Sequence, residues 1–202
     1  MKRAWFLVGL LALGCLCSPG GCWLGRLFEE PAPERDFEVE DLVIDVSSFP
    51  QGWYSWVGPY RIPDSERGEE ESVYVEFHHE EVATDAVGAG QRVFRYANER
   101  ISGTAFPGLL RHEFHSSYMA TPWAAPDDWA YQSGVADQFE FACGEIALRR
   151  RYWRCQALAQ YDEYISFLYA ELHPEYMTPG DVERLVAAVD AQMAFYLGED
   201  PD

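Results

Sequence analysis

Two cysteines in one strand-like stretch, Asp137–Leu172, constrain the fold more than any other feature of this 202-residue chain. Apolar residues alternate there with polar ones on both sides of an arginine-rich centre, at Phe139, Phe141, Cys143, Trp153, Cys155, Ala157 and Ala159. Such alternation is typical of half-buried strands. A hairpin with its tip at Arg149–Arg151 brings Cys143 opposite Cys155, so we predict a disulfide between them. Two buried free thiols are the alternative.

The rest of the apolar pattern supplies one more clear strand and two helices. Val73–His78 alternates like a strand, whereas Gln91–Ala105 carries apolar residues on one helical face and is followed by Pro107. Thr178 begins an N-terminal capping motif for a final helix that Gly198 ends. We therefore predict an α+β fold, in which an antiparallel sheet has both helices packed on one face and a single disulfide joins a β-hairpin.

The acidity of the chain excludes some functions. Its formal net charge is −19, and Lys2 is its one lysine. A nucleic-acid-binding protein needs a basic face, so we expect no nucleic-acid partner. A chain that has lost Lys2 by processing has no lysine for Schiff-base chemistry.

The first 22 residues have the pattern of an export signal. Lys2 and Arg3 precede an apolar run, Ala4–Leu13, that is shorter than the roughly 20 residues of a membrane-spanning helix. The sequence Ala12-Leu13-Gly14-Cys15 then resembles the lipobox of bacterial lipoproteins, although that family prefers leucine at the position of Ala12 and a small residue at that of Leu13. The resemblance implies lipidation at Cys15; ordinary signal cleavage and an uncleaved anchor are the alternatives.

A loose second resemblance concerns the body of the chain. The segment Phe49–Trp53, the cysteine pair and the helix after Thr178 are similar to features of uncharacterised exported lipoprotein domains of bacteria. This resemblance implies an α+β sandwich and carries no functional residues. We divide the chain into a signal and lipobox segment at 1–22, an acidic proline-containing tether at 23–38 and one globular domain at 39–198.

Two groups of side chains are candidates for chemistry or binding. His112 and His115 flank Glu113 and would lie on one side of a helix, where they are weak candidates for a metal site. Their spacing differs from that of the HExxH zinc motif, and surface histidines with no metal-binding role would explain this pattern equally well. Trp123, Asp127, Asp128 and Trp129 lie on or beside a predicted loop, and they form our candidate binding surface.

These patterns favour a non-enzymatic domain that is tethered to a membrane outside the cytoplasm. We expect it to bind a protein or a small ligand at the cell envelope, with no cofactor. The alternative is an extracytoplasmic hydrolase that uses acidic residues and a metal held by the two histidines. The chain contains no GxSxG elbow and no phosphate-binding glycine loop, so no catalytic motif favours this alternative.

Overall fold

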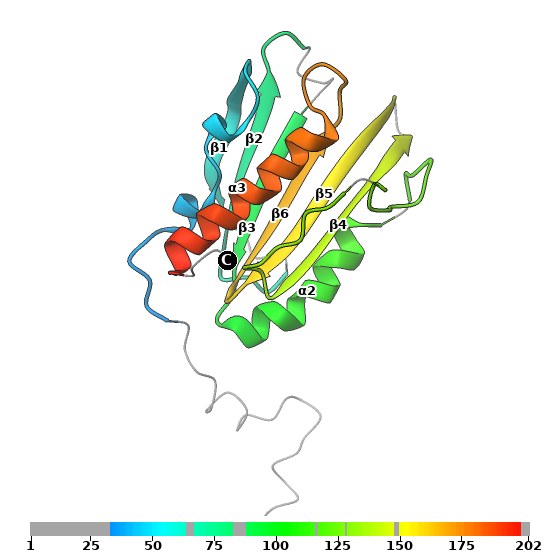
Figure 1. The fold of residues 1–202 in the computed structure, drawn as a ribbon. Helices are drawn as coiled ribbons and strands as arrows, with labels where there is room; N and C mark the ends of the chain where they lie inside the picture. The colour runs from blue at the N-terminus through cyan, green and yellow to red at the C-terminus, as the bar shows by residue number, and fades with distance from the viewer. Residues whose placement is uncertain are drawn as a thin grey trace, which may run out of the picture. The chain divides into compact units, whose positions relative to one another are not determined.

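A six-stranded antiparallel sheet forms the centre of the computed structural model, which describes residues 33–63, 67–82, 88–115, 117–127, 129–147 and 150–198 (Figure 1). The strand order is β1-β2-β3-β6-β5-β4. The strands are β1 (Trp53–Ile62), β2 (Glu71–His79), β3 (Gly88–Arg95), β4 (Gln138–Ala147), β5 (Arg151–Tyr161) and β6 (Tyr164–Glu171). The helical elements are η2 (Val39–Leu42), η3 (Val46–Ser48), α2 (Glu99–Glu113) and α3 (Pro179–Leu197).

The predicted hairpin and its disulfide are confirmed. Cys143 and Cys155 pair directly in the register between β4 and β5, and their sulfur atoms are bonded. The capping motif of the last helix is also confirmed, because Thr178 and Asp181 exchange the expected hydrogen bonds at the start of α3. Gly198 ends that helix with φ of 77°, a left-handed conformation that glycine adopts without strain.

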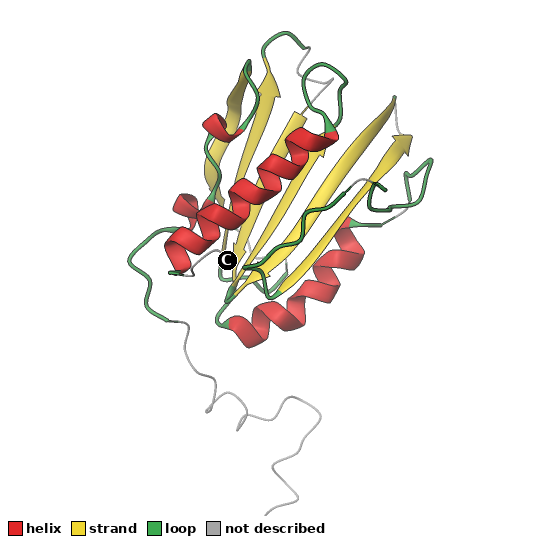
Figure 2. Cartoon of the chain, viewed as in Figure 1, coloured by secondary structure: helices red, strands yellow, loops and turns green. Residues whose placement is uncertain are grey.

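The two helices cover opposite faces of the sheet, which corrects the prediction that both pack on one face (Figure 2). Alternate residues of β5 and β6 belong to two separate apolar clusters. Ala157 and Leu168 belong to the α3 cluster, whereas Leu158 and Phe167 belong to the α2 cluster. Because these central strands are apolar on both faces, each face of the sheet needs a helix to remove it from water.

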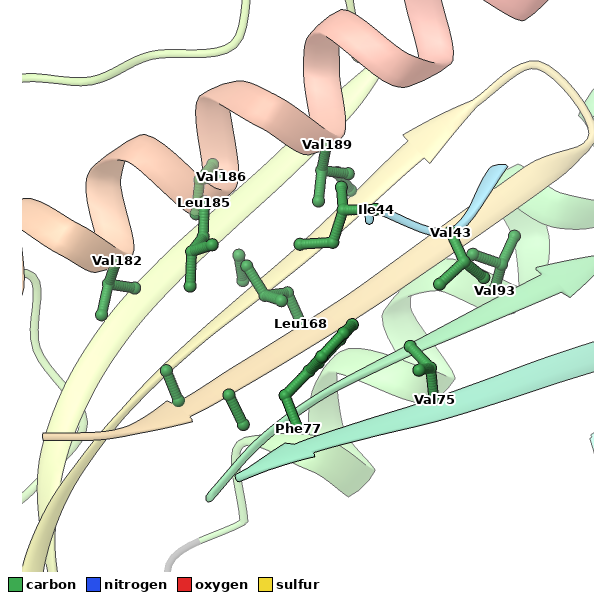
Figure 3. Packing of buried hydrophobic residues seen from close by; sticks show 14 of the residues in the cluster. Val43, Ile44, Val75, Phe77, Val93, Leu168, Val182, Leu185, Val186 and Val189 are labelled. Carbon is green, nitrogen blue, oxygen red and sulfur yellow. The ribbon is translucent and has the colours of Figure 1, made fainter. Parts of the chain in front are cut away.

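The α3 cluster is the larger core. Figure 3 shows Val182, Leu185 and Val189 of α3 directed towards the sheet, where Leu168 and Phe77 lie beneath them. The segment after η2 fills the neighbouring space, where Val43 and Ile44 are buried. The N-terminal end of the described chain is also packed, since Phe37 contacts this cluster and the guanidinium group of Arg35 donates hydrogen bonds to Glu163 at 2.8 and 3.0 Å.

The predicted helix Gln91–Ala105 is wrong at both ends. Its first residues form β3, where the fully buried Gln91 accepts a hydrogen bond from the Ile44 amide at 2.8 Å and donates one to the Ser166 hydroxyl at 3.0 Å. These partners are distant in sequence, so periodicity could not reveal them. The helix itself continues past Pro107, because Phe106 and Leu109 on either side of it are buried against the sheet.

No helix in the described part of the chain combines the length and the apolar character that crossing a membrane requires. The predicted signal segment and Cys15 lie outside the described residues, as does most of the predicted tether.

Candidate functional site: an apolar groove at Trp153

A hollow with three sides opens on the α3 face of the sheet, around the exposed side chain of Trp153. Its larger lobe has a volume of about 540 Å³ and is lined by Thr121, Pro122, Ala124, Ala125, Pro126, Asp127, Cys143, Trp153, Leu172 and Pro179. A smaller lobe of about 250 Å³ shares three of these residues and adds His173, Pro174, Met177 and Thr178. We call the two lobes together the Trp153 groove.

The floor of the groove comes from strands. Trp153 lies on β5 in register with Glu145 of β4, and Cys143 follows on the same face of β4. The Leu172 amide donates a hydrogen bond to the Trp153 carbonyl at 2.7 Å, which holds the end of β6 beside the indole. Trp153 is 48% exposed, although its alternate neighbour Cys155 is fully buried, so the hydrophobic core ends at this position.

One wall of the groove is the segment 118–127, which runs along the outer edge of β4. Two backbone hydrogen bonds join Ala124 to Cys143, at 3.0 and 2.9 Å, and the Ala120 amide donates to the Glu145 carbonyl at 2.7 Å. The Thr121 hydroxyl accepts a hydrogen bond from the Glu145 amide at 2.9 Å. These bonds occupy backbone groups on the edge of β4 and hold the wall in place.

The opposite wall is the turn between β6 and α3. The Tyr176 ring is stacked between His79 and His173, with ring centroids 4.1 and 4.6 Å away. The pKa of Tyr176 is raised by desolvation and by its hydrogen bond to Glu81. The Trp53 indole donates to the Tyr176 carbonyl at 2.9 Å, which ties this turn to β1.

The predicted binding surface is divided by the structure. The Trp123 ring packs against Phe114 at the end of α2, with centroids 5.5 Å apart, so it lies on the α2 side of the sheet edge. The Trp129 ring stacks on Phe141 at 3.4 Å and lies on the α3 side. Asp127 is the one residue of the predicted surface among the described residues that line the groove. Trp123 and Trp129 are not among these lining residues. Asp128 lies outside the described residues.

The predicted histidine pair lies elsewhere, at the end of α2. His112 and His115 are exposed, and their rings are nearly parallel with centroids 6.2 Å apart. Glu113, which separates them in the sequence, forms an ion pair with Arg67 at 2.7 Å. Within the described ranges, no three His, Cys, Asp or Glu side chains are grouped to hold a metal ion.

Sequence reasoning assigned Trp153 to a strand and did not recognise it as a site residue. Its alternation with Cys155 places the two side chains on the same face of β5, but only the packing of the two walls leaves the Trp153 ring uncovered. The loop 122–127 was the available signal, because binding residues occur disproportionately on loops that a rigid scaffold positions.

Comparison with known proteins assigns the chain to no family. No protein-family model matches the chain, and it matches no curated protein and no solved structure.

Proposed function

We propose that this chain is a membrane-tethered, extracytoplasmic binding domain whose Trp153 groove takes a small apolar ligand. The observation that supports this function is the groove, in which a half-exposed tryptophan forms the floor and two loops form the walls. Its larger lobe is within the range of about 300–1,000 Å³ that is usual for small-molecule sites.

The chemistry of the lining agrees with an apolar ligand. Prolines, alanines, Leu172 and Trp153 dominate the larger lobe, and Asp127 is its one charged residue among the described residues. An apolar lining with few polar groups is typical of ligand pockets, where burial supplies the affinity and the polar groups fix the orientation. A ligand that covers Trp153 would remove a large aromatic surface from water.

Two features support a location outside the cytoplasm. The disulfide between Cys143 and Cys155 is of a kind that persists in oxidising compartments. The lipobox-like sequence at Cys15 supports a lipid tether that joins the domain to a membrane. Mass spectrometry of the mature N-terminus tests the tether: a diacylated Cys15 is expected, and an unmodified or longer N-terminus would contradict it.

Ligand binding is tested with N-phenyl-1-naphthylamine, a neutral apolar probe that fluoresces when it leaves water. We expect saturable binding of one probe per chain. Ala125 is exposed and lines the groove, so Ala125→Trp fills the larger lobe and lowers the affinity by at least about tenfold, which is ~1.4 kcal/mol.

Ala191→Trp is the matched control, because Ala191 is exposed on α3 and is not among the lining residues. Wild-type affinity is expected for this variant. Equal losses in the two variants, or no saturable binding by the wild-type protein, would refute the groove as the binding site. The metal that the hydrolase alternative invokes has no group of three His, Cys, Asp or Glu side chains to hold it among the described residues.

A further inference from the structure

We infer that the ligand of the Trp153 groove is a small organic cation, with an apolar body and one ammonium group. This inference rests on the proposed function, since it names the class of ligand for the same groove. Three observations support it: the carboxylate in the lining, the compensation of the neighbouring charges and the exposure of the Trp153 indole.

The lining of the groove carries a negative charge. Asp127 is exposed and lines the larger lobe. His173 lines the smaller lobe, and its Nδ1 atom accepts a hydrogen bond from the Glu175 amide at 3.2 Å. Asp127 is the one carboxylate among the described residues that line the two lobes.

The charged residues beside the floor compensate each other. Glu145 lies opposite Trp153 in the register of β4 and β5, and Arg151 is the next residue on the same face of β5. Their charged groups are 3.7 Å apart. This pair adds little net charge at the mouth of the groove, and the carboxylate of Asp127 is left as the local excess.

The indole of Trp153 gives a cation a second favourable contact. Tryptophan binds cations over its ring face more strongly than other aromatic residues do, and 48% of this side chain is accessible. The net charge of −19 attracts cations to the protein and repels anions. An anionic ligand would meet Asp127 as well as this overall charge.

The dimensions of the groove favour a small molecule over a basic peptide. Its lobes, of about 540 and 250 Å³, meet at Trp153, where the turn after β6 and Pro179 at the start of α3 close one side. An eight-carbon chain with a trimethylammonium group would place its chain along the prolines and its charge between Asp127 and the indole.

The test measures how well three probes with the same chain displace N-phenyl-1-naphthylamine from the wild-type protein: octyltrimethylammonium, octanol and octyl sulfate. We expect the cation to displace it at about tenfold lower concentration than the alcohol, and the anion to be the weakest of the three. Asp127→Asn and Trp153→Leu should each reduce the ratio of cation to alcohol affinity by about threefold to fivefold.

Glu70→Gln is the matched control for the loss of one negative charge. Glu70 is exposed and precedes β2 at the opposite end of the sheet, about 30 Å from Trp153 along the strand direction at 3.3 Å per residue. The Glu70→Gln variant should have the same ratio of cation to alcohol affinity as the wild-type protein. If Glu70→Gln lowers the ratio as much as Asp127→Asn does, the preference comes from the overall charge and the inference is wrong.

The outcomes separate this inference from the proposed function. Equal displacement by the cation and the alcohol would overturn the cationic ligand and leave the apolar groove standing. Failure of the wild-type protein to bind the probe at all would overturn both. A five-residue apolar peptide with one lysine that binds more tightly than octyltrimethylammonium would overturn the assignment to a small molecule.

Discussion

Tyr131→Phe tests how the segment that follows the groove wall is held against α3. The Tyr131 hydroxyl donates a hydrogen bond to Asp190 Oδ2 at 2.5 Å, and the Tyr161 hydroxyl donates to the other oxygen of the same carboxylate. Asp190 lies on α3 and is 3% exposed. Burial and the bond to Asp190 raise the pKa of Tyr131, so its hydroxyl keeps the proton that it donates.

The expected loss of stability follows from the charge of the acceptor. A hydrogen bond to a charged group contributes about 1.5–3 kcal/mol, and removing one donor leaves a buried carboxylate short of a partner. We therefore expect Tyr131→Phe to lower the free energy of unfolding by about 2 kcal/mol. For a domain of this size that change corresponds to a decrease of about 4–8 °C in Tm.

Tyr96→Phe is a matched control with the same chemical change. Tyr96 is fully buried, and its hydroxyl has no hydrogen-bond partner among the described residues. Removing that hydroxyl should leave the stability unchanged or raise it by up to about 1 kcal/mol. Urea unfolding followed by circular dichroism, under oxidising conditions, measures both variants against the wild-type protein.

A loss of less than about 0.5 kcal/mol in Tyr131→Phe would refute this reasoning. It would mean that water replaces the hydroxyl at Asp190 without a penalty. Equal losses in Tyr131→Phe and Tyr96→Phe would also refute it, because the difference between a bonded and an unbonded hydroxyl is the basis of the prediction.

Three further predictions concern pH, the disulfide and one glycine. Burial raises the pKa of both Tyr96 and Tyr164 from 10 to about 12, so the folded state binds more protons than the unfolded state between these pH values. The free energy of unfolding should therefore fall as the pH rises from about 10 to 12. Urea titrations across this range measure it, and a flat profile would contradict the prediction. Replacing Cys143 and Cys155 by serine should lower the free energy of unfolding by about 3 kcal/mol, because the oxidised chain closes a short loop; an unchanged urea midpoint would show that the bond adds nothing. Gly52→Ala should destabilise by about 1–2 kcal/mol, since Gly52 has φ of +90° and a β-carbon there would collide with the His79 ring; wild-type thermal stability would show that the turn relaxes freely.

Elements with a complete local signal were predictable from the sequence. The capping motif at Thr178 and the hairpin of Cys143 and Cys155 depend on neighbouring residues and on alternation, and the sequence shows both. The buried strand β3 lacked such a signal, because Gln91 has a polar side chain whose hydrogen-bond partners are in β6 and the segment after η2. Periodicity cannot indicate partners that tertiary packing supplies.

The candidate site was less predictable than the fold. The sequence predicts a loop around Asp127, and in the structure Asp127 is exposed and lines the groove. However, Trp123 and Trp129 are placed on opposite sides of the β4 edge, where each packs on another aromatic ring. Which tryptophan stays uncovered depends on where the walls end, and that geometry leaves Trp153 accessible.

The strand order also has a consequence for how fast the chain folds. The strands β1, β2 and β3 pair with their sequence neighbours, as do β4, β5 and β6, so each half of the sheet assembles through local hairpins. The halves meet only where β3 pairs with β6, for example at Arg95 and Tyr164, which are far apart in the sequence. Closing this long-range pair costs the most chain entropy, and we expect it to limit the rate. Substitutions at the β3–β6 seam should therefore slow refolding, whereas those between β1 and β2 should mainly accelerate unfolding.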